Sequence, residues 1–231
     1  MPSKPHIDVV IPAFNEENAV GNVVRDLPRS WVREVVVVNN NSRDDTRRAA
    51  EAAGATVLDE PRQGYGYACL RGIEYLKHKE VPPEVVVFID ADYSDYPEEL
   101  PTLVQHLTDH QLDLVIGSRA LGKRQRGSMT PQQVFGNWLA TTLMRWLYGI
   151  HYTDLGPFRA VRFATLLEMN MQDKTYGWTV EMQLKAAKLG FAVGEVPVTY
   201  RVRIGHSKVS GTLKGTLLAG YKILSWIFKY R

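Results

Sequence analysis

Short apolar runs and amphipathic stretches alternate along the first half of the chain. Runs rich in valine and isoleucine predict buried strands over residues 7–11, 34–38, 55–58, 85–89 and 113–116. Helical spacing and capping residues predict helices over residues 15–27, 42–54, 64–78 and 97–110. Because strands and helices alternate, we expect an α/β fold with a mostly parallel central sheet flanked by helices.

The pattern changes after Gly117. Four arginine and lysine side chains stand among three glycines over residues 117–127, which predicts a mobile basic loop. Thr130-Pro131 then predicts the start of a helix that runs to Tyr148. Its apolar stripe is assigned to the core, with burial at a membrane interface as the alternative: Val134, Phe135, Trp138, Leu139, Leu143, Trp146 and Leu147.

The last third predicts helices over residues 160–169 and 179–189, and a strand over 195–200 in which Pro197 favours a sheet edge. Residues 211–231 predict a basic amphipathic C-terminal helix, because lysines oppose an apolar side made of Leu213, Leu217, Tyr221, Leu224 and Phe228. Such a helix can dock on the domain with its lysines in water, or lie on an anionic membrane. The pattern leaves both open.

Composition narrows the class of protein. With 231 residues, 45% hydrophobic and 23% charged, the chain is long enough for a substantial core. A formal charge of +3 without an aromatic-studded basic array gives no reason to expect a nucleic-acid partner. A single cysteine, Cys69, excludes an internal disulfide framework and a cysteine-based zinc cluster. The first six residues lack the apolar core of a signal peptide, so we expect a cytoplasmic protein, peripheral at most on the inner face of the cell membrane.

Two carboxylates, Asp90 and Asp92, end the apolar run of residues 85–89. Ligands of open α/β sheets bind at the carboxyl ends of the strands, where these side chains are expected. Hard oxygen ligands suit Mg²⁺ or Mn²⁺, which combine one or two carboxylates with substrate phosphates. A turn-capping role for both aspartates is the alternative.

Six short motifs stand in a fixed order along nearly the whole chain. They are VIPAFNEE (10–17), VNNNS (38–42), DAD (90–92), VIGSR (115–119), DLGPFRA (154–160) and RIGHSK (203–208). This set resembles the GT-A-fold family 2 glycosyltransferases, in the branch around dolichol-phosphate mannose synthase. The resemblance implies that residues 1–231 form one GT-A-like domain that transfers a sugar from a nucleotide-diphosphate sugar.

The resemblance also implies where the donor is held. Mg²⁺ or Mn²⁺ would bind Asp92, with Asp90 in the metal shell or on the ribose. Both aspartates are thus metal candidates, and Asp92 is a catalytic one, because the ion neutralises charge on the departing diphosphate. The wall of the nucleotide pocket would come from Pro12, Asn15 and Glu16. At Gly64, the missing side chain would let the backbone approach the nucleotide.

Asn39 is where the chain departs from many relatives, which carry two aspartates at the positions of residues 39 and 40. A carboxylate accepts both N–H groups of guanine, whereas an amide offers one acceptor and one donor, which suits uracil. We therefore expect a UDP-sugar rather than a GDP-sugar as the donor. The alternative is that backbone groups read the base.

Acceptor groups are implied further along the chain. Asp154, Arg159 and Glu181 are the catalytic candidates on the acceptor side; for a hydroxyl acceptor, a base would be needed, with Asp154 preferred over Glu181. Arg119 would meet an acceptor phosphate. A C-terminal segment with Arg203, Ser207 and Lys208 would grip phosphate.

Together these features predict a metal-dependent, inverting glycosyltransferase with a polyprenyl (dolichyl-type) phosphate acceptor. The basic loop, the aromatic helix and the basic C-terminal helix favour that lipid acceptor. A small soluble acceptor is the rival within the same class. A non-catalytic module that binds nucleotide sugars is the rival from another class.

Overall fold

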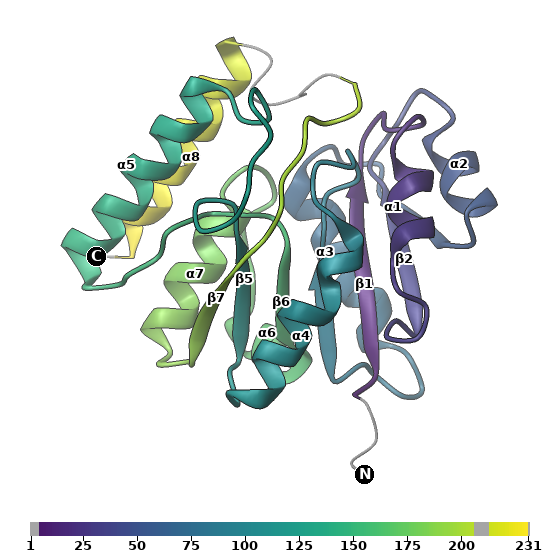
Figure 1. The fold of residues 1–231 in the computed structure, drawn as a ribbon, viewed down its shortest axis with the longest axis horizontal. Helices are drawn as coiled ribbons and strands as arrows, with labels where there is room; N and C mark the ends of the chain where they lie inside the picture. The colour runs from purple at the N-terminus through teal and green to yellow at the C-terminus, as the bar shows by residue number, and fades with distance from the viewer. Residues whose placement is uncertain (1–4, 206–212, 231) are drawn as a thin grey trace.

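A computed structural model describes residues 5–205 and 213–230, and Figure 1 shows their arrangement. Seven strands form one sheet in the order β3-β2-β1-β4-β6-β5-β7. In chain order they are β1 (Ile7–Ala13), β2 (Glu34–Asn39), β3 (Thr56–Asp59), β4 (Val85–Phe88), β5 (Leu114–Ser118), β6 (Arg159–Arg162) and β7 (Val193–Pro197). All neighbours pair in parallel except β6, which runs antiparallel to β4 and β5. The predicted α/β fold with a mostly parallel sheet is confirmed.

The helices fill the intervals between strands. They are α1 (Val20–Asp26), α2 (Thr46–Ala52), α3 (Tyr65–Lys77), α4 (Leu100–Asp109, after the short 3₁₀ turn η1, Pro97–Glu99), α5 (Pro131–Tyr148), α6 (Phe163–Met169), α7 (Trp178–Lys188) and α8 (Leu213–Lys229). Two predicted helix starts were too early. Residues 15–19 and 42–45 form turns, because Ser42 Oγ accepts a hydrogen bond from Asn15 N instead of capping a helix.

Residues 160–162 correct another prediction. The apolar run over 160–169 was expected to be one helix, but its start is strand β6, which pairs Val161 with Val86 of β4 and with Leu114 of β5. Those partners are distant in sequence, so local periodicity does not reveal them. The predicted edge strand is confirmed: β7, with Pro197, closes one side of the sheet.

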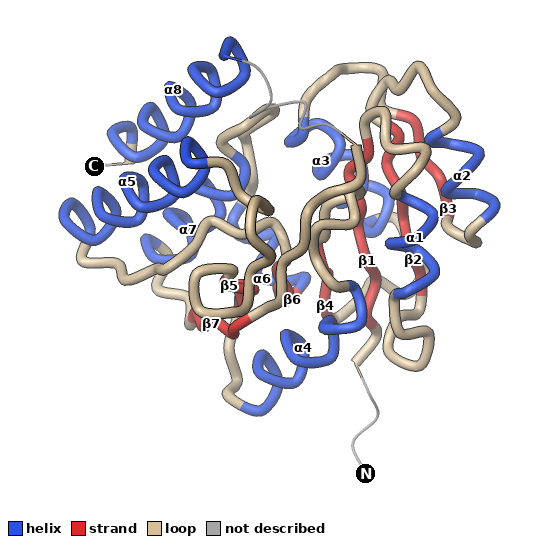
Figure 2. The backbone as a smooth tube through the Cα atoms, turned by 45° about the horizontal axis from the view of Figure 1, so that its top comes forward, coloured by secondary structure: helices blue, strands red, loops and turns tan. Residues whose placement is uncertain are grey.

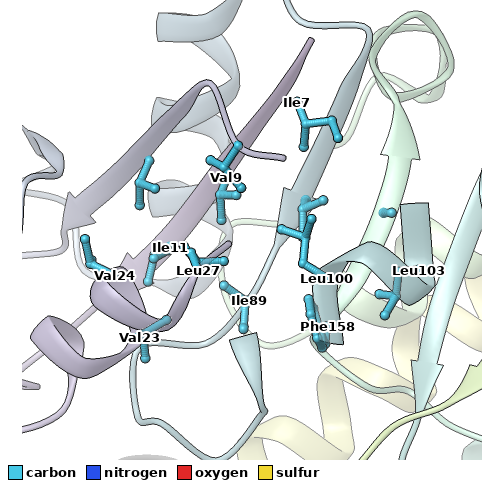
Figure 3. Packing of buried hydrophobic residues seen from close by; sticks show 14 of the residues in the cluster. Ile7, Val9, Ile11, Val23, Val24, Leu27, Ile89, Leu100, Leu103 and Phe158 are labelled. Atoms are coloured by element: carbon cyan, nitrogen blue, oxygen red, sulfur yellow. The ribbon is translucent and has the colours of Figure 1, made fainter. Parts of the chain in front are cut away.

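Both faces of the sheet are covered by apolar side chains. One core cluster packs α1, α2 and α4 on one face, and Figure 3 shows its centre, where Ile11, Val23, Leu27 and Leu100 meet. A second cluster packs α3, α6 and α7 on the other face, with Phe88 edge-on to Trp178. This double coverage explains why the central strands are almost continuously apolar.

Helices α5 and α8 lie side by side outside α7 (Figures 1 and 2). They share a small cluster that buries Met144 of α5 together with Trp226 and Ile227 of α8. Assigning the apolar stripe of α5 wholly to the core was wrong for four of its members, which are exposed: Val134, Phe135, Trp138 and Trp146. Two members of the predicted apolar side of α8, Tyr221 and Phe228, are exposed.

A returning segment, residues 198–204, completes the sheet edge that carries the site. Arg201 N donates to Ser94 O at 2.9 Å on one side, and Tyr200 N donates to Lys123 O at 2.9 Å on the other. The predicted mobile basic loop is therefore tied by backbone hydrogen bonds to this segment, which we call the strap. The part of the chain that the structure describes includes no helix long and apolar enough to cross a membrane.

Candidate active site

The predicted site residues gather at one edge of the sheet. Asp90 follows β4, Asn39 ends β2 and Arg119 follows β5, so all three lie at the carboxyl ends of strands that point the same way. Arg159 begins β6, which runs in the opposite direction and therefore starts at this same edge. This antiparallel strand thus brings Arg159 to the same edge of the sheet as the aspartate pair.

Asp90 is a half-buried residue whose carboxyl group is not fully hydrogen-bonded. Its Oδ1 is buried and has no hydrogen-bond partner, while its carboxyl interacts with the hydroxyl of Tyr65, at the start of α3. Burial raises the pKa of Asp90 to about 6, and the charge of Asp92 adds to the rise, whereas Arg203 opposes it. A buried oxygen without a partner beside a second carboxylate is an arrangement that a cation would stabilise.

Asp92 is held more firmly than Asp90. Its Oδ1 accepts from the backbone N–H of Ser94 at 2.9 Å, and its Oδ2 forms an ion pair with Arg203 at 2.7 Å. Burial alone would lower the pKa of Arg203, but the charge of Asp92 raises it above its ordinary value. The strap therefore places the positively charged guanidinium of Arg203 beside the aspartate pair. Ser207 and Lys208 lie outside the described residues.

The loop after β1 has the geometry of a pocket wall. Pro12 is in β1, and the backbone then turns at Asn15, which has a left-handed φ of 53°. Asn15 N donates to Ser42 Oγ at 3.0 Å, and Glu16 N donates to Thr46 Oγ1 at 2.7 Å. These bonds fix the loop after β1 against the loop after β2, although the two are far apart in sequence.

The two asparagines at the end of β2 have different surroundings. Asn39 donates through Nδ2 to Asp59 at 3.0 Å, and its Oδ1 is buried without a partner, so an acceptor remains for a ligand. Asn40 is buried and saturated: its Nδ2 donates to Glu60 O at 3.1 Å, and its Oδ1 accepts from Gly64 N at 2.7 Å. The structure thus separates one asparagine that can meet a base from one that holds the next loop.

Gly64 is a position where only glycine fits. A Cβ built there would lie 2.2 Å from Lys174 O, inside van der Waals contact with the backbone. The glycine therefore allows close packing against a neighbouring loop as well as a turn into α3.

Arg119 and Asp154 form a buried, bidentate ion pair. Arg119 donates through Nε and a terminal nitrogen to the two carboxylate oxygens of Asp154, each at 2.7 Å, and its backbone N–H donates at 2.8 Å. Burial would lower the pKa of Arg119, but Asp154 raises it further than burial lowers it. This pair occupies both oxygens of Asp154, so in this arrangement Asp154 orients Arg119. The exposed cations of the basic loop are Lys123, Arg124 and Arg126.

Arg159 is fully buried, and its guanidinium donates hydrogen bonds to backbone carbonyls. Its guanidinium donates to Gly156 O at 2.6 Å and to Thr179 O at 3.1 Å. Burial lowers the pKa of Arg159 to about 10. The side chain therefore fastens the start of β6 to the start of α7 and brings positive charge under the site.

Glu181 is engaged on both carboxylate oxygens. They accept from the backbone N–H groups of Gln172 and Asp173, each at 2.7 Å, and Oε1 also pairs with Lys185 at 2.8 Å. The side chain is fully buried. In this geometry Glu181 holds the loop between α6 and α7.

The donor set fits a hard divalent cation bound together with a substrate. Across residues 5–205 and 213–230, no three Asp, Glu, His or Cys side chains converge on a common point that could cage an ion. Two neighbouring carboxylates, one with a free buried oxygen, are what Mg²⁺ or Mn²⁺ uses when diphosphate oxygens and water complete its shell.

Sequence reasoning missed the side chains that hold the strap. Arg201 lies over the rings of Tyr93 and Tyr96, at 3.4 and 4.0 Å from the ring centroids, and donates to Tyr93 O at 2.7 Å. Asp95 is buried, and both of its carboxyl oxygens lack a hydrogen-bond partner. The sequence does place Asp95 three residues after Asp92, but only the pairing of Asp95 with Tyr200 of the strap shows that it belongs to the site.

Comparison with known proteins identifies the family. The family model described as glycosyl transferase family 2 matches residues 8–168, which span the aspartate pair and the start of β6. The chain belongs to this family. The resemblance of the six motifs is thereby confirmed, and the protein is a glycosyltransferase.

This glycosyltransferase is similar in sequence to two relatives and in fold to one solved structure. An uncharacterized glycosyltransferase of Mycobacterium tuberculosis is 35% identical over 221 residues, covering 92% of this chain and 94% of the relative. The undecaprenyl-phosphate mannosyltransferase of Micrococcus luteus is 32% identical over 221 residues, covering 89% and 88%.

The structure is that of glucosyl-3-phosphoglycerate synthase from Mycobacterium tuberculosis, in complex with Mn²⁺, UDP-glucose and phosphoglyceric acid. It matches with a TM-score of 0.76 at 23% identity, over 98% of this chain and 79% of that one. The likeness confirms the GT-A fold.

Proposed function

We propose that this chain transfers a sugar, with inversion, from a UDP-sugar to a polyprenyl phosphate at the inner face of a membrane. The observation that carries the proposal is the pair Asp90–Asp92 at the carboxyl end of β4, in which Asp92 is buried and Asp90 has a buried oxygen without a partner, with Arg203 of the strap paired to Asp92. The pair can share a divalent cation with a diphosphate, and Arg203 supplies a second positive charge for the same leaving group.

On the donor side, Asn39 offers the unpartnered Oδ1 to the N3–H of uracil, while the loop of Pro12, Asn15 and Glu16 forms the wall. Mg²⁺ or Mn²⁺ on Asp90 and Asp92, when bound, stabilises the negative charge on the departing UDP. We place the turn at Gly64 beside the nucleotide, because Gly64 N donates to Oδ1 of Asn40, the neighbour of Asn39.

On the acceptor side, a phosphate oxygen attacks the anomeric carbon from the face opposite UDP. A bond from this oxygen to carbon forms as the bond from carbon to the diphosphate breaks. Because a phosphate monoester is already ionised near neutral pH, no strong base is required. Asp154 is held by Arg119, and Glu181 is held by backbone N–H groups and by Lys185. These contacts agree with a reaction that needs no strong base. We therefore assign Asp154, Arg159 and Glu181 to positioning, and Arg119 to the field that attracts the acceptor phosphate.

The outer helices support a lipid acceptor. Phe135 and Trp138 on α5 are 59% and 58% exposed, and they line an apolar hollow of about 510 Å³ with Met129, Pro131 and Val134. The exposed cations of the basic loop precede this hollow in the chain. Apolar rings beside cations match the surface of an anionic membrane, where rings insert and cations meet headgroups.

A transfer assay tests the proposal. The chain is given radiolabelled UDP-sugars and GDP-mannose, with Mn²⁺, in the presence and absence of undecaprenyl phosphate. We expect label to enter the lipid phase from a UDP-sugar only, and EDTA or Asp92→Asn to abolish transfer. Transfer from GDP-mannose would contradict the base assignment. Transfer to 3-phosphoglycerate without lipid would contradict the acceptor assignment.

Vesicle flotation tests the membrane surface separately. We expect the chain to float with phosphatidylglycerol vesicles and much less with phosphatidylcholine vesicles. Replacing both Phe135 and Trp138 by Ser should reduce flotation at least several-fold, because two inserting rings are lost. Val81→Ser is the matched control, since Val81 is 55% exposed but lies on the loop before β4, away from α5. Equal flotation of all three proteins would contradict a membrane role for α5.

A further inference from the structure

The loop between α6 and α7, residues 170–177, contains a buried acid that the proposed reaction does not use. Asp173 is 2% exposed. Its Oδ1 accepts from the backbone N–H groups of Thr175 at 2.7 Å and Gly177 at 3.0 Å. Its Oδ2 accepts from the indole N–H of Trp226 on α8 at 2.5 Å, and Lys222 of α8 lies 3.9 Å away. One oxygen shapes the loop, and the other binds the C-terminal helix.

Trp226 fits against this loop because there is no side chain opposite it. A Cβ built on Gly177 would lie 2.3 Å from Cδ1 of Trp226, so only glycine leaves room for the indole. Tyr230, which directly follows α8, stacks on the indole of Trp226 at a centroid distance of 5.4 Å. Trp226 thus fastens the described part of α8 to the loop by a direct hydrogen bond.

The opposite side of the same loop touches the turn into α3. Tyr67 N donates to Lys174 O at 3.1 Å, and Gly66 N donates to Thr175 O at 3.3 Å. A Cβ on Gly66 would lie 2.0 Å from Asp173 O, so the two backbones are in direct contact there as they are at Gly64. A displacement of the loop by a few tenths of an ångström therefore has to move the turn into α3 as well.

That turn borders the proposed donor pocket. Gly64 N donates to Oδ1 of Asn40, and Asn40 follows Asn39, whose free acceptor we assign to the base. The Asp90 carboxyl interacts with Tyr65, the next residue of the turn. A continuous series of contacts thus runs from α8 through Asp173 to the turn into α3. From there it reaches Asn39, which we assign to the nucleobase, and Asp90, which we assign to the metal.

We propose that Asp173 is a positioning residue that couples the seating of helix α8 to the affinity of the donor pocket. The inference rests on the proposed function only in that the Gly64 turn borders the nucleotide. When Trp226 is bound to Asp173, the loop supports the turn in its binding shape; when α8 leaves, the turn loses that support and donor affinity falls. Because coupling between two sites is reciprocal, a bound nucleotide also tightens the seating of α8.

Calorimetry with UDP and Mn²⁺ on the full chain tests the coupling. Trp226→Phe keeps an aromatic ring but removes the N–H donor, and Asp173→Asn keeps the shape but replaces the charged acceptor. We expect each variant to bind UDP roughly five- to tenfold more weakly, which corresponds to the net contribution of one ordinary hydrogen bond. The double variant should be no weaker than the worse single one, because both substitutions remove the same contact.

Trp31→Phe is the matched control. It makes the same indole-to-phenyl change at a residue that packs against the other core cluster, before β2 and away from the site edge. We expect it to alter the thermal midpoint without altering UDP affinity. Wild-type protein that binds neither UDP nor GDP would overturn the proposed function. Wild-type protein that binds UDP with the same affinity as Trp226→Phe would overturn the coupling alone.

Hydrogen exchange on the wild-type chain gives a readout that needs no variant. Addition of UDP and Mn²⁺ should slow exchange at residues 64–67, at 172–177 and at 222–230 together. Protection confined to residues 10–17, 39–40 and 64–67, with unchanged exchange in α8, would contradict the proposal.

Discussion

Asp90 is a residue whose position serves binding at the expense of stability. Its ordinary carboxyl pKa of 3.8 is raised to about 6 by burial and by Asp92. The folded chain therefore binds this proton more tightly than the unfolded chain does. The stability that the protonated group contributes is complete below pH 3.8 and is lost as the pH rises through about 6. Near neutral pH, the fold thus retains a carboxylate that weakens it.

Asp90→Asn should accordingly stabilise the chain at high pH while destroying its donor site. The difference between about 6 and 3.8 corresponds to at most about 3 kcal/mol. In EDTA at pH 8 we expect the variant to melt several degrees above wild type, and at pH 4 to show little of that advantage. Thermal unfolding at both pH values measures it. A variant that is less stable than wild type at pH 8 would show that the carboxylate is not destabilising. Loss of UDP–Mn²⁺ binding should accompany the gain.

Sequence patterns identified the aspartate pair because a buried strand that ends in carboxylates is a local signal. They did not reveal what each carboxylate faces. Arg119 and Asp154 were separate candidates in the sequence, and only the fold shows that they neutralise each other. The same holds for Glu181, whose two backbone N–H donors lie in the loop that precedes its own helix.

At the scale of elements, prediction succeeded where the signal was local. Thr130-Pro131 predicted the start of α5, and the structure has a full capping box there: Thr130 Oγ1 accepts from Gln133 N, and the Gln133 side chain accepts from Thr130 N. Strand β6 was missed because four residues of a strand flanked by apolar helix-like sequence carry no distinguishing period. The exposed side of α5 was missed because a helical stripe does not reveal whether protein or membrane covers it.

Thr130→Ala should therefore destabilise α5 specifically. Loss of an N-cap costs about 1 kcal/mol, which corresponds to roughly 2–4 °C in thermal midpoint for a chain of this size. Thr130→Ser, which keeps the hydroxyl, should recover most of it. If Ala and Ser melt alike, the cap does not contribute as the geometry indicates. Differential scanning calorimetry makes the comparison.

At the scale of the whole molecule, the family was evident from the order of six motifs and the α/β sheet from the alternation of strands and helices. How the loops close around the site was not evident. The site is assembled from loops after β1, β2, β4 and β5, the entry to β6, and the strap. Each loop alone reads as an ordinary turn. These loops come together because of the order of the strands in the sheet. That order cannot be read from the local patterns of one sequence.

A ligand that contacts several of these loops should raise the stability of the folded chain as a whole. We expect UDP with Mn²⁺, at a hundred times its dissociation constant, to stabilise the chain by about 2.7 kcal/mol. Roughly 5–10 °C in thermal midpoint corresponds to this gain. EDTA should cancel the effect, and Asp92→Ala should fold but show no shift. A midpoint that rises equally with UDP in EDTA would show that the nucleotide binds without a metal.

The strap also has a consequence for how the protein is made. Arg203 completes the environment of Asp92, although 111 residues separate the two along the chain. On the ribosome, the sheet strands from β1 to β4 emerge long before their last partner. The nascent protein must therefore hold a carboxylate-rich surface in water until its final third has been synthesised. Pairings over such distances slow folding, so we expect the candidate site to close only after the strap has been synthesised.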